Sequence, residues 1–265
     1  MDQGAQELVT LASSVARRAA ETARRMRLQG VGRVDTKSTA TDVVTAADKA
    51  VERQIVADLR AARPGDTVLG EEYGTDAAGG PVRWIVDPID GTVNYLYGLA
   101  HYAVSIAAEV DGRVVAGVVH NAATDAQWTA TAGGGAWRDG RRLAGSTQSD
   151  LGQALVGTGF AYDARRRQHQ AAVLSGLITR VRDIRRFGSA ALDLTAAAEG
   201  QLDAFYEQGL QAWDLAAGGL IAREAGLLVT GLRGREAGPD MVLAAPPALH
   251  GPLHDRLAEL DADGS

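Results

Sequence analysis

Residues 5–28 place apolar and charged side chains with the period of an amphipathic helix. The apolar face is formed by Leu8, Leu11, Val15, Ala19, Ala23 and Met26. The opposite face carries Arg17, Arg18, Arg24 and Arg25. A basic amphipathic helix can lie on a membrane, but this apolar face is mostly alanine and too small to anchor strongly. We therefore expect the helix to pack on the protein's own core.

Residues 45–61 repeat the helical period behind a helix-start signal. Thr45 and Asp48 have the spacing of a capping box. Further along the chain, Trp84-Ile85-Val86 predicts a short buried strand. The proline after Asp87 disfavours helical geometry at that aspartate, so we expect the strand to end and the chain to turn there.

Residues 103–143 alternate in the manner of an antiparallel meander, with hairpin turns at Asp111-Gly112 and Asp139-Gly140. Beyond residue 145, strands and helices alternate. The predicted elements are a strand at 154–158, a helix at 165–181, a strand at 184–187, a helix at 189–199, a strand at 202–207, a helix at 213–225, strands at 227–230 and 241–245, and a closing helix.

Residues 1–145 therefore form a predicted α+β half and residues 146–265 a predicted α/β half, joined at Gly145-Ser146-Thr147. No repeat or low-complexity linker separates the halves, which favours one layered body with a cleft between them. Gly133-Gly134-Gly135 lacks the Lys-Ser/Thr of a phosphate-binding P-loop, so we interpret it as a bend in the meander.

Composition narrows the function classes. The chain has 265 residues, of which 46% are hydrophobic and 23% charged, which is typical of a globular protein. A net charge of −6 offers no broad surface for nucleic acid, and the absence of cysteine excludes thiolate chemistry and disulfides. The chain has neither a signal peptide nor an 18-residue apolar stretch, so a cytoplasmic protein is expected. Its five histidines lack metal-ligand spacing.

Acidic residues at predicted element boundaries are the main chemical signal. They are Glu71, Asp87, Asp90 and Asp214. Asp90 has the character of a helix cap three residues after the expected strand end, so both carboxylates of this loop can face one point. Two carboxylates about 4 Å apart repel by roughly 4 kcal/mol at an effective dielectric constant near 20. Such a pair favours a shared proton or a cation, and hard oxygen ligands point to Mg²⁺.

The same loop offers an anion site. Backbone N–H groups of Gly91 and Thr92 would be free at a helix start, where phosphate can bind. The Thr92 hydroxyl with Glu71 could then orient or deprotonate an attacking water. Asp-Pro and Asp-Gly pairs are also common in surface turns, and only the combination of segments favours a site. The aspartates are three residues apart, not the two of an aspartyl-phosphate loop, which disfavours a covalent intermediate.

Five segments together resemble one family. They are Asp42-Val-Val-Thr45-Ala-Ala-Asp48, Gly70-Glu71-Glu72, Trp84-Ile-Val-Asp87-Pro-Ile-Asp90-Gly-Thr92-Val-Asn94-Tyr95, Arg186-Phe187-Gly188-Ser189-Ala190-Ala191, and Trp213-Asp214-Leu-Ala-Ala-Gly218. In order and spacing they look like the inositol monophosphatase family. The resemblance implies a layered αβαβα sandwich of the inositol monophosphatase/fructose bisphosphatase type, usually dimeric, that uses two to three Mg²⁺ ions and is inhibited by Li⁺.

The resemblance also implies roles for single residues. The first metal would be bound by Glu71, Asp87 and the Ile89 carbonyl, the second by Asp87, Asp90 and Asp214, and a weaker third by Glu71. Phosphate would lie on residues 90–92, with Thr92 positioning the water and Asp48 supporting it. The predicted border of the substrate is Gly188, Ser189 and Ala190.

Glu207 matches the glutamate that accepts hydrogen bonds from inositol hydroxyls, which favours a small phosphorylated polyol as substrate. Gln211 departs from the histidine of many animal enzymes, so the sugar pocket can differ. Lys37 is a candidate for contact with the anion. We therefore predict a Mg²⁺-dependent phosphatase that hydrolyses myo-inositol monophosphate. One alternative is the same chemistry on histidinol phosphate, a sugar bisphosphate or an adenosine bisphosphate. The other alternative is a regulatory RNA-associated protein of the same fold.

Overall fold

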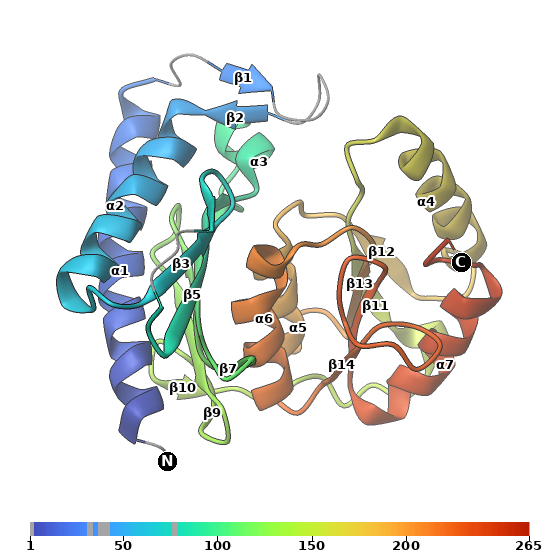
Figure 1. Ribbon diagram of the computed structural model, residues 1–265. Coiled ribbons are helices and arrows are strands. Elements are labelled where there is room, and N and C mark those ends of the chain that lie inside the picture. The colour runs from blue at the N-terminus through green and yellow to red at the C-terminus, as the bar shows by residue number, and fades with distance from the viewer. Residues whose placement is uncertain (1–2, 31–33, 37–42, 76–78, 265) are drawn as a thin grey trace.

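The computed structural model describes residues 3–30, 34–36, 43–75 and 79–264, which form five layers in the order helix, sheet, helix, sheet, helix (Figure 1). This confirms the α/β class and the layered αβαβα arrangement. The helices are α1 Gln3–Leu28, α2 Ala46–Ala62, α3 Thr92–Tyr97, α4 Ala164–Leu177, α5 Ala190–Ala198, α6 Ala212–Glu224 and α7 Pro247–Glu259. A short 3₁₀ turn spans Leu151–Gln153.

The strands form a hairpin and two sheets. Strands β1 Val34–Thr36 and β2 Val43–Thr45 make the hairpin. The first sheet contains β3 Thr67–Gly70, β4 Gly74–Thr75, β5 Val82–Asp90, β6 Ala103–Val110, β7 Arg113–Asn121, β8 Gln127–Thr131, β9 Gly135–Arg138 and β10 Arg141–Arg142. The second contains β11 Leu155–Thr158, β12 Asp183–Arg185, β13 Ala204–Glu207, β14 Leu228–Thr230 and β15 Val242–Ala245.

Helices α1 and α2 cover the outer face of the first sheet, as Figure 1 shows. The alanine-rich face of α1 is buried there, which confirms that this helix packs on the protein's own core. The capping box at the start of α2 is also confirmed, because Thr45 caps the helix and the Asp48 side chain accepts a hydrogen bond from the Thr45 N–H. Within the described residues, no helix is long and apolar enough to cross a membrane.

The first sheet has the strand order β10-β9-β8-β7-β6-β5-β3-β4. The meander from β6 to β10 is confirmed, and the first hairpin turn has positive φ at both Asp111 (50°) and Gly112 (75°). The expected end of the buried strand at Asp87 is wrong. Strand β5 continues to Asp90 through a shift of register between the two aspartates, and the chain turns at Gly91, which also replaces Asp90 as the N-cap of α3.

The second sheet has the order β12-β11-β13-β15-β14 and is mixed, because β15 runs antiparallel to both of its neighbours. All the predicted strands and helices of this half are present, with bounds shifted by a few residues. Helix α4 ends at Leu177 and not at residue 181. The strands that the sequence pattern missed, β1 to β4, are short, and the helix start expected after Asp90 is present as α3.

Helices α5 and α6 lie between the two sheets, so the halves share a core. Ile85 and Ala107 of the first sheet pack in one apolar cluster with Leu220 and Ile221 of α6. Because this core is shared, it does not mark a boundary, and the division of the chain at residue 145 stays a prediction.

The glycine run forms the expected bend, and its amides are occupied. The N–H groups of Gly133 and Gly135 donate to the two carboxylate oxygens of Glu224, at 2.7 and 2.8 Å. Because Glu224 is the last residue of α6, these two hydrogen bonds connect the C-terminal end of this central helix to the turn between β8 and β9.

Candidate active site

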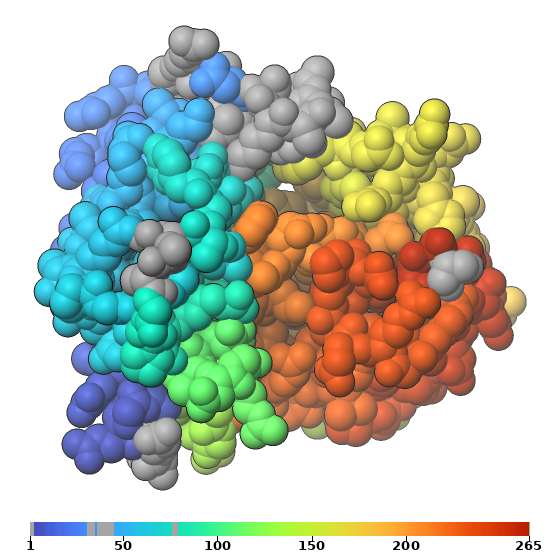
Figure 2. Space-filling model, in the orientation of Figure 1, coloured from blue at the N-terminus to red at the C-terminus, as the bar shows by residue number. Residues whose placement is uncertain are grey.

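A cavity of about 410 Å³ is lined by residues from the end of β5, the segment before α5, the end of β13 and the start of α6. Figure 2 shows the face on which the segments coloured blue to green meet those coloured orange to red. Of the residues that the sequence singled out for the site, the ones that line the cavity are Glu71, Asp87, Ile89, Asp90, Gly91, Thr92, Gly188, Ala190, Glu207 and Asp214. Asp48 and Ser189 lie behind this wall. The sequence did not single out a role for Tyr162, Arg166 or Arg186, which also line the cavity; two of them belong to the β11–α4 loop and the start of α4, where no recognisable motif occurs.

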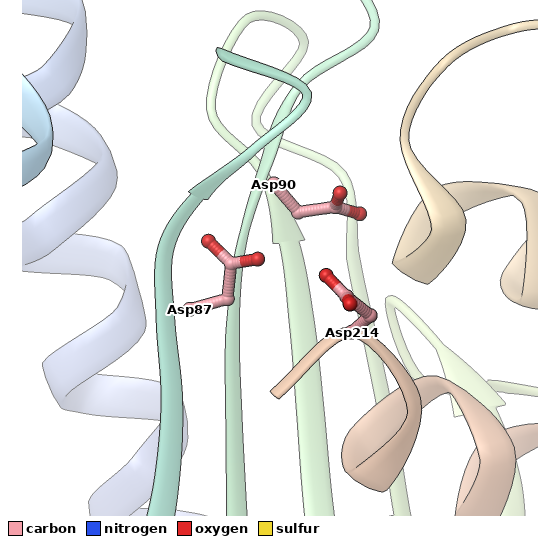
Figure 3. Close-up of side chains that lie close together, drawn as sticks. All are labelled: Asp87, Asp90 and Asp214. Atoms are coloured by element: carbon pink, nitrogen blue, oxygen red, sulfur yellow. The ribbon is translucent and has the colours of Figure 1, made fainter. Parts of the chain in front are cut away.

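Three aspartates that line the cavity converge. Asp87 and Asp90 come from the end of β5, where the irregular register turns both side chains to the same side. Asp214 comes from the first turn of α6 and points toward them (Figure 3). One oxygen atom from each carboxylate lies within 4.8 Å of the others. The Glu71 carboxyl makes a hydrogen-bond contact with Asp87 and so extends the group.

Burial and mutual repulsion disfavour ionisation of these acids. Burial raises the pKa of Asp87 well above its usual range, and the charges of Glu71, Asp90 and Asp214 raise it further. Burial raises the pKa of Asp90 to about 6, although hydrogen bonds from Ser189 and Ala191 oppose the shift. A cation would relieve this repulsion. The donor set consists of carboxylates and the nearby Ile89 carbonyl, which are the hard oxygen ligands that Mg²⁺ prefers, so the residues fit the expected metal.

Hydrogen bonds from backbone or hydroxyl groups hold all three aspartates, and Asp87 Oδ1 accepts one from the Ile89 N–H at 3.0 Å. The Ser189 hydroxyl and the Ala191 N–H donate to Asp90 Oδ2 at 2.6 and 2.7 Å. Asp214 Oδ2 accepts a 2.6 Å bond from the Gln211 N–H in the capping box of α6. Ser189 is thus placed behind Asp90 instead of on the cavity wall, where a residue bordering the substrate would lie.

The Thr92 hydroxyl lies between a carboxylate and a carbonyl. Its Oγ1 donates to Asp48 Oδ1 at 3.1 Å and lies 3.2 Å from the Ile89 carbonyl oxygen. Asp48 is fully buried, and its other oxygen accepts bonds from the N–H and the hydroxyl of Thr45 at 2.7 and 2.5 Å. Burial raises the pKa of Asp48 to about 6, with Thr45 opposing and Glu71 adding to the shift.

Gly91 allows the segment after β5 to pack closely against the α5 side of the cavity. Its φ is 92°, and a Cβ at this position would lie 2.9 Å from the His101 carbonyl oxygen and 3.1 Å from that of Gly188. The Asn94 amide donates to the carbonyls of His101 and Phe187, both at 2.8 Å. The segment that begins at Gly91 is therefore held against the segment before α5.

Glu207 lies half-buried at the end of β13 and lines the same cavity. Burial raises its pKa well above the usual range, the charges of Asp193 and Asp214 add to the shift, and Arg186 opposes it. Gly159 packs against its carboxylate so closely that a Cβ would overlap it. Gln211 also lines the cavity, and its side-chain amide donates to the Gly209 carbonyl.

All five histidines make hydrogen bonds through a ring nitrogen. They are His101 to Asp193, His120 to Gln127, His169 to the Asp261 carbonyl, His250 to Thr230, and His254 to the Arg233 N–H. Lys37, the candidate for contact with the anion, lies outside the described residues, as does Asp42 of the first motif.

Comparison with known proteins gives consistent matches along the chain. The profile of the inositol monophosphatase family matches residues 4–262. An inositol-1-monophosphatase of Mycobacterium leprae is 48% identical over 231 residues, which are 83% of this chain and 79% of the relative. A Nus factor SuhB of Salmonella typhimurium is 42% identical over 200 residues, 73% of each chain. The solved IMPase of Thermotoga maritima superposes with a TM-score of 0.89 at 28% identity, covering 98% of this chain and all of the other.

Proposed function

Because the chain belongs to the inositol monophosphatase family, we propose that it hydrolyses myo-inositol monophosphate to inositol and phosphate with the help of Mg²⁺. The observation that carries this proposal is the convergence of Asp87, Asp90 and Asp214 in a cavity that Thr92 and Glu207 also line. Carboxylates that bind metal, a hydroxyl that can hold water and an acceptor for polyol hydroxyls are then combined in one site.

The proposed metal ligands follow the sequence argument. Glu71, Asp87 and the Ile89 carbonyl would hold one ion, and Asp87, Asp90 and Asp214 a second, while Glu71 would face a weaker third. Bound Mg²⁺ supplies Lewis-acid chemistry, which lowers the pKa of water and offsets the charge of phosphate. The same ligand set is the basis for the proposed inhibition by Li⁺.

The chain's own residues position the reactants. The Thr92 hydroxyl donates its hydrogen to Asp48, which leaves its lone pairs free to accept a hydrogen bond from the attacking water. Glu71 is the proposed acceptor of the water's proton. The N–H groups of Gly91 and Thr92, with Asp90, form the proposed phosphate site at the cavity wall. Water attacks phosphorus directly in this scheme, and no phosphoenzyme forms.

Glu207 is proposed to recognise the leaving group. It lines the same cavity as the aspartates but comes from β13, and it is not one of the three acids whose oxygens converge. When ionised, its carboxylate only accepts hydrogen bonds, and vicinal hydroxyls of inositol can donate to both of its oxygens. Gly188 and Ala190 complete the proposed border of the substrate on the α5 side.

A panel of phosphate esters tests the proposal. With Mg²⁺ present, phosphate release should give the highest kcat/KM for inositol 1-phosphate, above histidinol phosphate, a sugar bisphosphate and an adenosine bisphosphate. Asp214→Asn is the matched negative control, because it keeps the shape of the side chain and removes its charge. A higher kcat/KM for another ester would replace the inositol assignment.

The Salmonella relative named Nus factor SuhB supports a second candidate, a regulatory protein associated with RNA machinery. The net charge of −6 does not favour direct RNA binding. A mobility-shift assay with RNA beside the phosphate-release assay separates the two functions. RNA binding without phosphate release would favour the regulatory candidate.

A homodimer is proposed from the resemblance, and three exposed apolar side chains support it. The exposed apolar side chains Tyr97, Leu99 and Phe187 are 76, 57 and 40% exposed, and the Phe187 ring contacts His101 beside the Gly91 segment. We expect light scattering to show a dimer that Leu99→Glu dissociates. A wild-type monomer would contradict this proposal. Location in the cytoplasm stays a prediction.

A further inference from the structure

Glu52 lies one helical turn after Asp48 on α2, with its carboxylate buried beneath the loop that carries Glu71. Its Oε2 accepts a hydrogen bond from the Glu72 N–H at 2.8 Å, and its Oε1 accepts one from the Tyr73 N–H at 3.0 Å. Both donors belong to the residues that follow Glu71 directly. Glu52 is 1% exposed and does not line the cavity.

The backbone on the other side of Glu71 is also held. The Glu71 N–H donates to the carbonyl of Val86, the residue before Asp87, at 3.2 Å. Gly70 leaves room for Glu52, because a Cβ on this glycine would overlap the Glu52 carboxylate. The Glu71 backbone is therefore fixed from β5 on one side and from α2 on the other.

The chemistry of this contact requires a carboxylate. Two backbone N–H groups point at one side chain, and an ionised glutamate offers two oxygens that only accept. A glutamine would turn an NH₂ donor toward one of the two amides. Burial, with the charges of Glu72 and Glu71, raises the pKa of Glu52 and disfavours its ionised form. The hydrogen bonds from the two backbone N–H groups oppose this shift and stabilise the carboxylate.

We propose that Glu52 is a positioning residue, which fixes the Glu71 carboxylate against Asp87 and so preorganises the first metal site. The inference rests on the proposed function, in which Glu71 is a metal ligand. Asp48 holds Thr92 from the preceding turn of the same helix. One face of α2 thus sets the spacing between Glu71 and Thr92, the two residues proposed to handle the attacking water.

Glu224 provides a matched control. Its carboxylate also accepts from two backbone N–H groups, those of Gly133 and Gly135. It lies ten residues after Asp214, about 15 Å along α6. Glu224→Gln therefore makes the same chemical change at a loop away from the metal site.

Isothermal titration of the full chain with Mg²⁺, without substrate, tests the proposal. Glu52→Gln should raise the Kd of the tightest Mg²⁺ site about 10- to 100-fold. Glu224→Gln should leave this Kd at the wild-type value, although both variants should lower the Tm. A wild-type Kd in a folded Glu52→Gln protein would overturn the proposal, because Glu52 would then only hold the loop.

Glu52→Asp covers the case in which Glu52→Gln does not fold. Aspartate keeps both acceptor oxygens but is one methylene shorter, so the Kd should rise above that of the wild type, and an unchanged Kd overturns the proposal here too. Failure of the proposed function has a different signature. In that case the wild type itself binds no Mg²⁺ or releases no phosphate.

Discussion

Ser189 and Asp90 are 99 residues apart in sequence, and the Ser189 hydroxyl donates a 2.6 Å hydrogen bond to Asp90 Oδ2 inside the protein. The same hydroxyl caps α5, where it accepts from the Leu192 N–H at 3.4 Å. One side chain thus starts a helix of the second half and orients a proposed metal ligand of the first. This link explains why a residue expected at the substrate border lies behind the carboxylates.

Ser189→Ala should therefore affect both stability and the site. Loss of the cap should cost about 1 kcal/mol of the free energy of unfolding. Loss of the bond to Asp90 should lower Mg²⁺ affinity or kcat by roughly tenfold or more. Thermal unfolding with and without Mg²⁺ separates these effects. A variant with a lower Tm but the full Mg²⁺-induced increase would show that the hydroxyl acts only as a cap.

Mg²⁺ should raise the Tm of the wild-type protein, because a ligand that binds only the folded state stabilises it. Asp90→Asn removes one charge from the cluster without changing its shape, so it should reduce this increase and abolish most activity. Differential scanning calorimetry and phosphate release measure the two effects. Wild-type turnover in Asp90→Asn would contradict the two-metal assignment.

Thr92→Ala should separate metal binding from chemistry. The hydroxyl is not among the proposed metal ligands, so the Mg²⁺-induced rise in Tm should persist. The kcat for inositol 1-phosphate should fall by about 10²- to 10⁴-fold, since the water loses its positioning group. Quench experiments during turnover provide an independent check, and a trapped phosphoenzyme would refute direct attack by water.

Glu207→Ala should change recognition more than chemistry. A hydrogen bond to a charged acceptor contributes about 1.5–3 kcal/mol, so kcat/KM for inositol 1-phosphate should fall roughly 10- to 150-fold. A small aryl phosphate, which lacks the polyol, should be hydrolysed almost as before. An equal loss with both substrates would place Glu207 in the folding or metal machinery instead.

The metal-free protein should lose stability as the pH rises from about 4 to about 6. Burial raises the pKa of both Asp48 and Asp90 to about 6 in the folded state, above their values in an unfolded chain. In this window the folded protein binds more protons than the unfolded one, so the free energy of unfolding falls with rising pH. The loss is complete above the folded-state pKa.

Thermal unfolding in EDTA at pH 5 and pH 7 checks this expectation, with a higher Tm at pH 5. Mg²⁺ should oppose the trend, because a bound cation favours the ionised carboxylates. A metal-free Tm that increased between pH 5 and pH 7 would contradict the assignment of protons to these buried acids.

The sequence predicted features that depend on neighbouring residues. The capping box of Thr45 and Asp48 and the turn at Asp111-Gly112 are set by side chains within three positions, and both are confirmed. The prediction that the strand ends at Asp87 was wrong. Pro88 lowers the local strand tendency, but the pairing of β5 with β6 continues beyond this proline through an irregular register. Strands β3 and β4 are too short to carry a periodic signal.

The site was predictable only where side chains carry the chemistry. The four acids and Thr92 form recognisable motifs, so their assembly in one cavity could be expected. Glu52 could not be found in this way, because its partners are backbone amides 20 and 21 residues away, and every residue except proline has such an amide. The contact of Ser189 with Asp90 likewise depends on how α5 packs against β5.

The distribution of the three aspartates along the chain has a consequence for biosynthesis. Asp87 and Asp90 are made early, but Asp214 belongs to α6, whose buried face completes the core of the first sheet. While the polypeptide is still growing on the ribosome, the first sheet lacks this cover and the carboxylate cluster lacks its third member. The proposed second metal site, which needs Asp214, is therefore completed only when the central helix docks, whereas the proposed ligands of the first site, Glu71, Asp87 and Ile89, are all made earlier.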